Sequence, residues 1–236
     1  TRSNMASVAG RIGGPMDRAA AVSMALPKDK LLSIAQDYLD NPSPDKWSDD
    51  YVFRGPVIGP LAKKDIIETL GSVAEDMKVA FPDMENNAFG LTADDPIEPN
   101  RVWYFRRPRA TWSGPFKHPT AGVLEPPEGG KPYIAPPEAC SIILTDDGLV
   151  QYQSVGYVTD RFTGDNTGGR GAVFGLYAVM GQEIDASVGS PITSLLQKVA
   201  AMLPDGPDGK PTIPKSYSKP EDLPAWWKDK RMGAEA

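Results

Sequence analysis

The order of the periodic segments most constrains the fold, because two helix-like segments come first and consecutive strand-like segments follow. Apolar residues at helical spacing predict helices at residues 27–39 and 62–80. Alternating aromatic and β-branched runs then predict strands at 86–92, 100–112, 137–145 and 149–160. Consecutive strands after two helices favour an α+β domain with an antiparallel sheet.

Turn residues separate these segments. Pro42 and Pro44 end the first helix, because proline donates no amide hydrogen and disfavours helix in the preceding residue. Residues 47–53 are expected to form a turn that leads into a short strand, and Asp146-Asp147-Gly148 predicts a hairpin turn. The Pro- and Gly-rich connection 115–137 is too long for a plain hairpin and is expected to act as a flap.

A glycine-rich segment, residues 163–171, follows the last predicted strand. It lacks the GxxxxGK[ST] pattern of a phosphate-binding loop and is interpreted as a flexible connection. Residues 172–180 fit either a strand or a short helix. A third helix is predicted at 191–203, with Ser190 as its N-cap.

The domain boundaries follow from composition. Residues 1–26 are expected to be an N-terminal extension and residues 27–203 the folded domain. Residues 204–236 form a Pro-rich tail that has too little apolar content for a core of its own. The adjacent Trp226 and Trp227 represent a large apolar surface, so the tail is expected to dock on its own domain or on a protein partner.

Charge and hydropathy restrict the possible partners and locations. The net charge of −6 disfavours binding to nucleic acid, since phosphate-binding proteins usually carry a basic face. No apolar run is long enough for a membrane helix, and a soluble protein, cytoplasmic or organellar, is expected. Residues 1–26 contain three arginines and one acid, which fits a processed transit peptide, and hence a plastid, or residues left from expression.

Metal and disulfide chemistry is disfavoured. One cysteine, Cys140, and one histidine, His118, exclude an intrachain disulfide and a His/Cys zinc site, and no cofactor is expected. Cys140 lies in an apolar strand-like run, where a buried structural thiol is more common than a nucleophile.

Four guanidinium groups lie within nine residues. They are Arg101, Arg106, Arg107 and Arg109, and a strand divides such a series between its two faces. Three interpretations stay open: an anion site, a solvated face, and ion pairs with carboxylates.

Several segments together resemble a known family. The order of three segments is typical of the SnoaL-like branch of the NTF2-like superfamily. These segments are residues 51–55, a helix from Ala62 that ends near Phe81-Pro82-Asp83, and residues 110–116, which precede Pro-rich sequence. This resemblance implies an α+β cone, in which a curved antiparallel β-sheet packs on helices. The content of 24 Pro and 23 Gly adds the expectation of long irregular extensions at both termini. The resemblance also implies a pocket for a small, largely apolar organic ligand and a homodimer that pairs through the exposed face of the sheet.

The resemblance implies candidate functional residues as well. By position, Asp160 corresponds to the carboxylate that acts as general acid/base in the cyclases, whereas Trp112 stands where many members have histidine. His118 is a second catalytic candidate. The candidates for an aromatic ligand pocket, each with an ordinary core position as the alternative, are Trp103, Phe105, Trp112, Tyr152 and Tyr157. Two functions follow: cofactor-free acid/base isomerisation or cyclisation, and non-catalytic binding or assembly.

Overall fold

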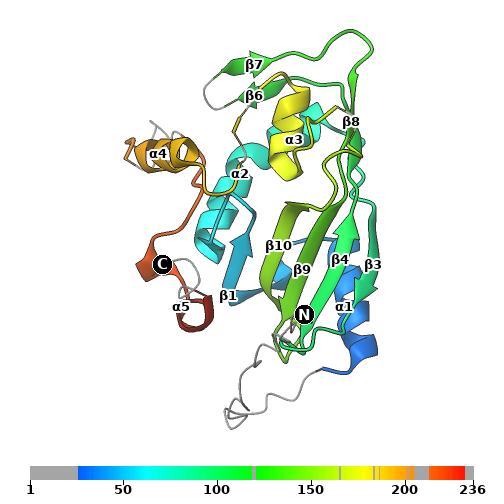
Figure 1. Cartoon of the computed structure of the whole chain (residues 1–236), viewed down its shortest axis with the longest axis vertical. Helices are drawn as coiled ribbons and strands as arrows, with labels where there is room; N and C mark the ends of the chain where they lie inside the picture. Colours follow the sequence, from blue (N-terminus) through cyan, green and yellow to red (C-terminus); the bar gives the residue numbers. More distant parts are fainter. Residues whose placement is uncertain are drawn as a thin grey trace, which may run out of the picture.

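The computed structural model describes residues 26–118, 121–164, 166–182, 184–185, 187–200, 202–204 and 213–231. Its centre is one six-stranded sheet with the strand order β2-β1-β10-β9-β4-β3 (Figure 1). The strands of this sheet are β1 (Trp47–Arg54), β2 (Leu61–Ala62), β3 (Ala88–Thr92), β4 (Arg101–Arg106), β9 (Glu138–Leu144) and β10 (Val150–Val158). The predicted α+β fold is therefore confirmed.

Four of the five junctions in this sheet are antiparallel. The fifth differs from the prediction, because β1 and β10 run parallel, with Phe53 opposite Gln153. The chain between these two strands is long enough to return in the same direction, as a parallel pair requires. The predicted hairpin turn between β9 and β10 is confirmed, and Gly148 has a φ of 89° there, which suits glycine.

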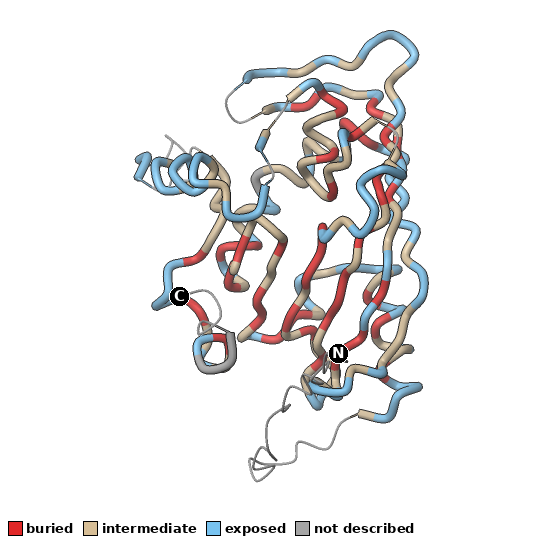
Figure 2. Tube along the Cα trace, viewed as in Figure 1, coloured by how far each residue is buried: buried red, intermediate tan, exposed pale blue. Residues whose placement is uncertain are grey.

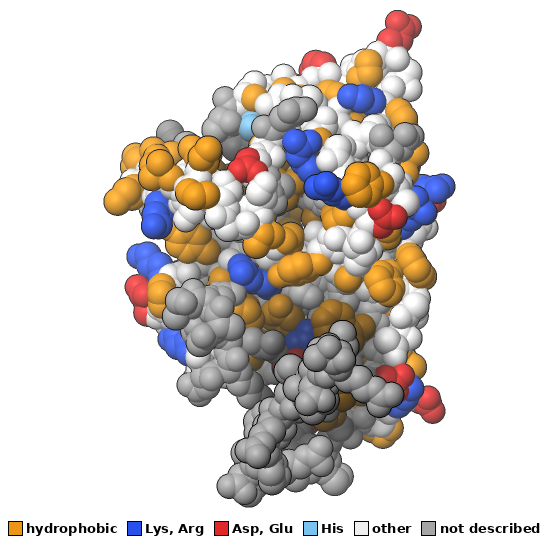
Figure 3. Space-filling model, viewed as in Figure 1, with side chains coloured by type: hydrophobic (Ala, Val, Ile, Leu, Met, Phe, Trp, Pro, Cys, Tyr) orange, Lys and Arg blue, Asp and Glu red, His pale blue; other side chains and the backbone are white. Residues whose placement is uncertain are grey.

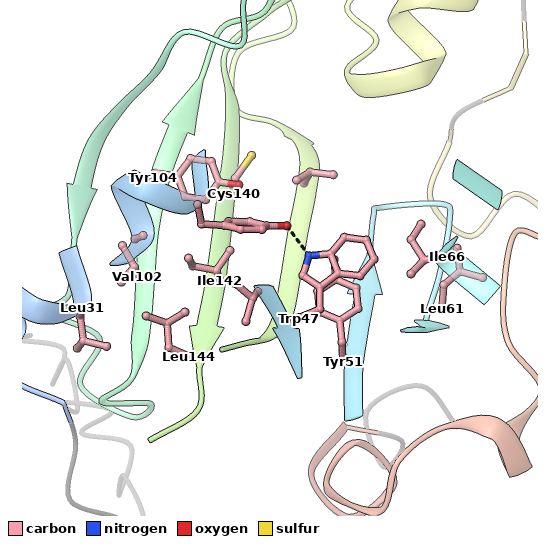
Figure 4. Close-up of a cluster of buried hydrophobic side chains, with 14 residues drawn as sticks. Leu31, Trp47, Tyr51, Leu61, Ile66, Val102, Tyr104, Cys140, Ile142 and Leu144 are labelled. Atoms are coloured by element: carbon pink, nitrogen blue, oxygen red, sulfur yellow. Dashed lines mark hydrogen bonds between the residues drawn. The ribbon is translucent and has the colours of Figure 1, made fainter. Parts of the chain in front are cut away.

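Two helices, α1 (Lys28–Asp40) and α2 (Lys63–Ala80), pack against one face of the sheet, which we call the inner face. In Figure 1, α1 lies behind the sheet. The main core lies between these layers, and the red segments of the sheet in Figure 2 mark its buried strands. Its largest members include Leu31, Tyr38, Trp47, Tyr51, Tyr104 and Ile142 (Figure 4). Alternation along β4 and β9 directs every second residue into this core.

Short strands and a helix build the other end of the molecule. The long connection predicted as a flap carries paired strands, β5 (Arg109–Trp112) with β8 (Lys131–Ile134) and β6 (Phe116–His118) with β7 (Gly122–Leu124). Residues 172–180, for which strand and helix were both open, contain α3 (Ala172–Val179). These elements surround a second core. That core contains Phe81, Trp112, Phe116, Tyr133 and Met180.

The predicted third helix is α4 (Pro191–Ala200), and Ser190 is its N-cap, because the Ser190 Oγ accepts from the Thr193 amide at 3.3 Å. None of its residues is buried. The apolar side chains of α4 lie on the surface, where Figure 3 shows hydrophobic atoms gathered. They are Ile192, Leu195, Leu196 and Val199.

The C-terminal segment, residues 213–231, packs against the opposite face of the sheet, which we call the outer face. Its short helix α5 (Ala225–Arg231) places Trp227 against Tyr152, with ring centroids 5.7 Å apart. The Trp226 indole donates to the backbone oxygen of Asp50 at 2.9 Å. Nearer its start, Lys215 forms an ion pair with Asp65 at 2.8 Å. The described part of the tail is thus attached to its own domain.

None of the described helices has both the length and the apolar character that crossing a bilayer requires.

Candidate ligand-binding site

A pocket of about 320 Å³ opens on the inner face of the sheet, and we call it the cone pocket. Most of its lining is aromatic or aliphatic, with polar groups at a few points. Its principal residues are Tyr38, Trp47, Tyr51, Phe53, Ile66, Leu70, Asn86, Ala88, Tyr104, Arg106, Gln153 and Val155. A concave, largely apolar site with a few polar groups is typical of small-molecule binding.

One glutamine organises the polar groups of this pocket. The Gln153 Oε1 accepts hydrogen bonds from the Tyr38 hydroxyl at 2.7 Å and the Tyr51 hydroxyl at 2.9 Å. The Trp47 indole in turn donates to the Tyr38 hydroxyl at 2.8 Å, drawn as a dashed line in Figure 4. The Trp47 and Tyr51 rings stack with centroids 4.2 Å apart. These contacts connect α1, β1 and β10 and hold the aromatic wall in one arrangement.

Burial determines the protonation of the phenols. It raises the pKa of Tyr38 to about 12 and raises the pKa values of Tyr51 and Tyr104 well above their usual value. All three side chains are therefore neutral hydrogen-bond donors at physiological pH. The pocket wall disfavours negative charge on the protein's own groups, because a desolvated anion is costly.

Arg106 is the cation that lines this pocket. Its Nε donates to the Glu138 Oε2 at 2.7 Å, and the Glu138 side chain is fully buried. The other carboxylate oxygen, Oε1, accepts from the backbone amide of Ala172 at 2.7 Å. A Cβ on Gly171 would lie 2.9 Å from this oxygen, so the approach of the glycine-rich segment requires glycine. The Arg106–Glu138 ion pair thus links the pocket to the start of α3.

The arginine series is divided between the two faces of β4, as predicted. Arg101 lies on the outer face, where Nε donates to Glu98 at 2.7 Å, whereas Arg106 lies on the inner face. Of the three interpretations that the sequence left open, ion pairing with carboxylates applies to both residues. Arg106 is in addition placed beside the pocket.

The predicted aromatic residues lie elsewhere. Trp103, Phe105 and Tyr157 are partly exposed on the outer face, and Tyr152 packs there against the C-terminal segment. Trp112 belongs to the second core, with its indole donating to the Gly114 backbone oxygen at 2.9 Å. None of these five residues lines the cone pocket. The structure brings together Tyr38, Tyr51, Tyr104 and Trp47 instead.

The predicted catalytic residues are also separate from one another. Asp160 is exposed just beyond β10, and its Oδ1 accepts from the Phe162 amide at 3.0 Å. His118 lies in the β6–β7 hairpin at the other end of the molecule, with Nδ1 accepting from the Ala121 amide at 3.0 Å; partial burial lowers its pKa. Neither side chain lines the cone pocket. Cys140 is buried in the main core, and this burial raises its pKa to about 11.

Few sequence signals point to the pocket residues that the prediction missed. The polar residue Gln153 in the period-two pattern of β10 is one such signal, since a buried amide needs partners. Tyr38 and Tyr51 carry hydroxyl groups within otherwise apolar faces of α1 and β1. Glu138 gives no local signal, because its partner Arg106 lies 32 residues away in the sequence.

Within the described residues, no group of three or more His, Cys, Asp or Glu side chains is arranged to hold a metal ion.

Comparisons with known proteins return structural neighbours at low identity. No protein-family model matches the chain, and a search of curated proteins returns no match. A phenazine biosynthesis-related protein from Pseudomonas aeruginosa is 15% identical, with 69% of this chain and 94% of that chain covered and a TM-score of 0.41. The likeness is one of fold.

Two further neighbours are described as SnoaL-like. A protein from a Jannaschia species is 15% identical over 54% of this chain and 85% of its own, with a TM-score of 0.37. Another, from Agrobacterium tumefaciens, is 13% identical over 54% of this chain and 96% of its own, with a TM-score of 0.32.

Proposed function

We propose that this protein binds a small, largely apolar organic molecule in the cone pocket. The observation that carries the proposal is the composition of the lining, in which aromatic and aliphatic side chains, with the Trp47 and Tyr51 rings stacked, line about 320 Å³ and polar groups are few. Burying an apolar ring against such a wall is favourable at roughly 25 cal/mol for each Å² removed from water. Arg106, which lines the same pocket, supplies the hydrogen bonds that orient the ligand.

Acid/base isomerisation or cyclisation with Asp160 as proton carrier is a second candidate function. The observation in its favour is that Asp160 closely follows β10, the strand that supplies Gln153 and Val155 to the pocket. Catalysis requires its carboxylate to come within hydrogen-bond reach of the ligand. Asp160→Asn separates the two functions: unchanged ligand binding with lost turnover supports the enzyme, and unchanged turnover excludes this mechanism.

A homodimer that pairs through the outer face is a further part of the proposal. Four aromatic side chains are exposed there, and Figure 3 shows hydrophobic atoms spread over this side of the molecule. They are Phe89, Trp103, Phe105 and Tyr157. Exposed aromatic side chains on one face are typical of a protein interface. Sedimentation equilibrium tests this part, since the mass of a monomer at micromolar concentration contradicts it.

The binding proposal is tested by filling the pocket. Ala88→Phe places a ring among the lining residues, whereas Ile97→Phe adds the same ring at a side chain that is 85% exposed and outside the pocket. We measure the binding of naphthalene by the change in tryptophan fluorescence, because Trp47 lies in the wall. Affinity is expected to fall by about tenfold or more in Ala88→Phe, by steric exclusion, and to stay unchanged in Ile97→Phe.

The control for folding is the circular dichroism spectrum, which should match the wild type in both variants. Equal affinity in the wild type and Ala88→Phe would place the binding site elsewhere.

A further inference from the structure

Arg106 has hydrogen-bonding capacity that the described chain leaves unused. Its Nε donates to Glu138, whereas its two terminal nitrogens make no hydrogen bond with any described residue. The side chain is only 18% exposed, and it lines the cone pocket. Neither terminal nitrogen is among the described polar atoms that are buried without a partner, so both keep contact with the accessible surface and can donate to an acceptor that enters the pocket.

The charge of Arg106 is already balanced. Glu138 lies against it with no exposure to solvent, and both carboxylate oxygens are used, one by Arg106 and one by the Ala172 amide. A neutral acceptor that binds the free nitrogens keeps this pair neutral. A carboxylate instead adds a negative charge that the ion pair does not compensate, in a pocket walled mainly by apolar groups.

The apolar environment of the pocket also changes the pKa values of the tyrosines in the same wall. Burial raises the pKa values of Tyr38, Tyr51 and Tyr104, so the ionised form of each phenol is disfavoured beside the pocket. The same loss of hydration disfavours a ligand anion. Neutral oxygen is therefore the acceptor that best matches both Arg106 and the wall.

We propose that Arg106 anchors a neutral carbonyl oxygen of the ligand and that Glu138, by balancing the guanidinium charge, makes the pocket select carbonyl compounds over carboxylates of the same shape. The ligand class is a ring-containing ketone, ester or amide, with the ring against the aromatic wall. This inference rests on the proposed function of the pocket. Glu138 acts here as a positioning residue, since it touches Arg106 and not the ligand.

Three matched probes test the inference: naphthalene, 2-acetylnaphthalene and 2-naphthoate, titrated at pH 7 with the full chain by calorimetry. We expect the ketone to bind about tenfold more tightly than naphthalene, because it adds hydrogen bonds to a charged donor. It should also bind about tenfold more tightly than the carboxylate, which loses its hydration without a compensating charge.

Variants separate the two roles. Arg106→Met should remove the advantage of the ketone over naphthalene, and Arg109→Met, an exposed arginine outside the cone pocket, should leave it unchanged. Glu138→Gln keeps the size of the side chain and removes its charge, so the affinity for 2-naphthoate should rise about tenfold while that for the ketone changes little.

The outcomes distinguish the inference from the function on which it rests. If either 2-naphthoate or naphthalene binds the wild type as tightly as the ketone does, the inference about Arg106 and Glu138 is wrong and the pocket remains a ligand site. If none of the three probes binds, both proposals are overturned. Should Glu138→Gln fail to fold, the wild-type preference and the Arg106→Met titration still decide the result.

Discussion

Replacing Trp227 tests whether the C-terminal segment is a structural part of the domain. Its side chain is 2% exposed and packs with Val52, Ala62, Tyr152 and Leu223. A buried indole removes about 200 Å² from water, which is worth roughly 5 kcal/mol at 25 cal/mol per Å². Its Nε1 is buried and has no hydrogen-bond partner among the described residues, which costs about 1–3 kcal/mol.

These two contributions predict different results for two substitutions. Trp227→Ala removes the apolar contact, which destabilises the fold, and also removes the unpaired donor, which offsets part of that loss. The free energy of unfolding should therefore fall by about 3 kcal/mol. Trp227→Phe keeps most of the ring contact and removes the same donor, so its free energy of unfolding should stay within about 1 kcal/mol of the wild type.

Urea unfolding followed by circular dichroism measures both values. Trp226→Phe is the matched comparison, because its indole donates to the Asp50 backbone oxygen and its loss should cost about 1 kcal/mol. The reasoning is refuted if Trp227→Ala changes the free energy of unfolding by less than about 1 kcal/mol, since the segment would then not be docked in solution, or if Trp227→Ala and Trp227→Phe destabilise equally.

Two other predictions concern pH and assembly. Burial raises the pKa of Tyr38 from 10.0 to about 12, so the unfolded chain releases this proton at lower pH than the folded chain does. The contribution of Tyr38 to the free energy of unfolding is therefore fully present below pH 10 and is lost between pH 10 and 12. The loss should reach about 2 kcal/mol for this residue at pH 12, as measured by urea unfolding against pH. Tyr38→Phe should make the profile less steep in this range, with the remaining slope due to other buried tyrosines such as Tyr51 and Tyr104. If the outer face pairs two chains, Phe105→Lys should shift the sedimentation mass towards the monomer, whereas Ile97→Lys, on a side chain 85% exposed, should not.

The periodic pattern of the sequence predicted the elements well, because each element has a strong local signal. The apolar spacing of 62–80 corresponds to α2, and the alternating run 149–160 corresponds to β10. The hairpin at Gly148 followed from a turn type that requires positive φ. The parallel β1–β10 junction was missed, since strand neighbours far apart in the sequence leave no local trace.

The pocket was harder to predict, because both faces of β4 carry aromatic side chains. Alternation places Trp103 and Phe105 on one face of β4 and Tyr104 and Arg106 on the other, but it does not show which face meets the helices. Likewise in β10, Gln153 faces inward and Tyr152 faces the C-terminal segment. The position of α1 and α2 decides this choice, and that position depends on tertiary packing.

The β1–β10 junction also affects the order in which the chain can fold. β1 is made early, at residues 47–54, yet its parallel partner ends at residue 158. Closing so long a loop costs conformational entropy before the β1–β10 contacts can offset it. Contacts between residues far apart in the sequence therefore slow folding. During synthesis, the aromatic rings of Trp47 and Tyr51 have no β10 to pack against until about a hundred further residues have left the ribosome. Trp227, made later still, then covers the outer side of the same junction.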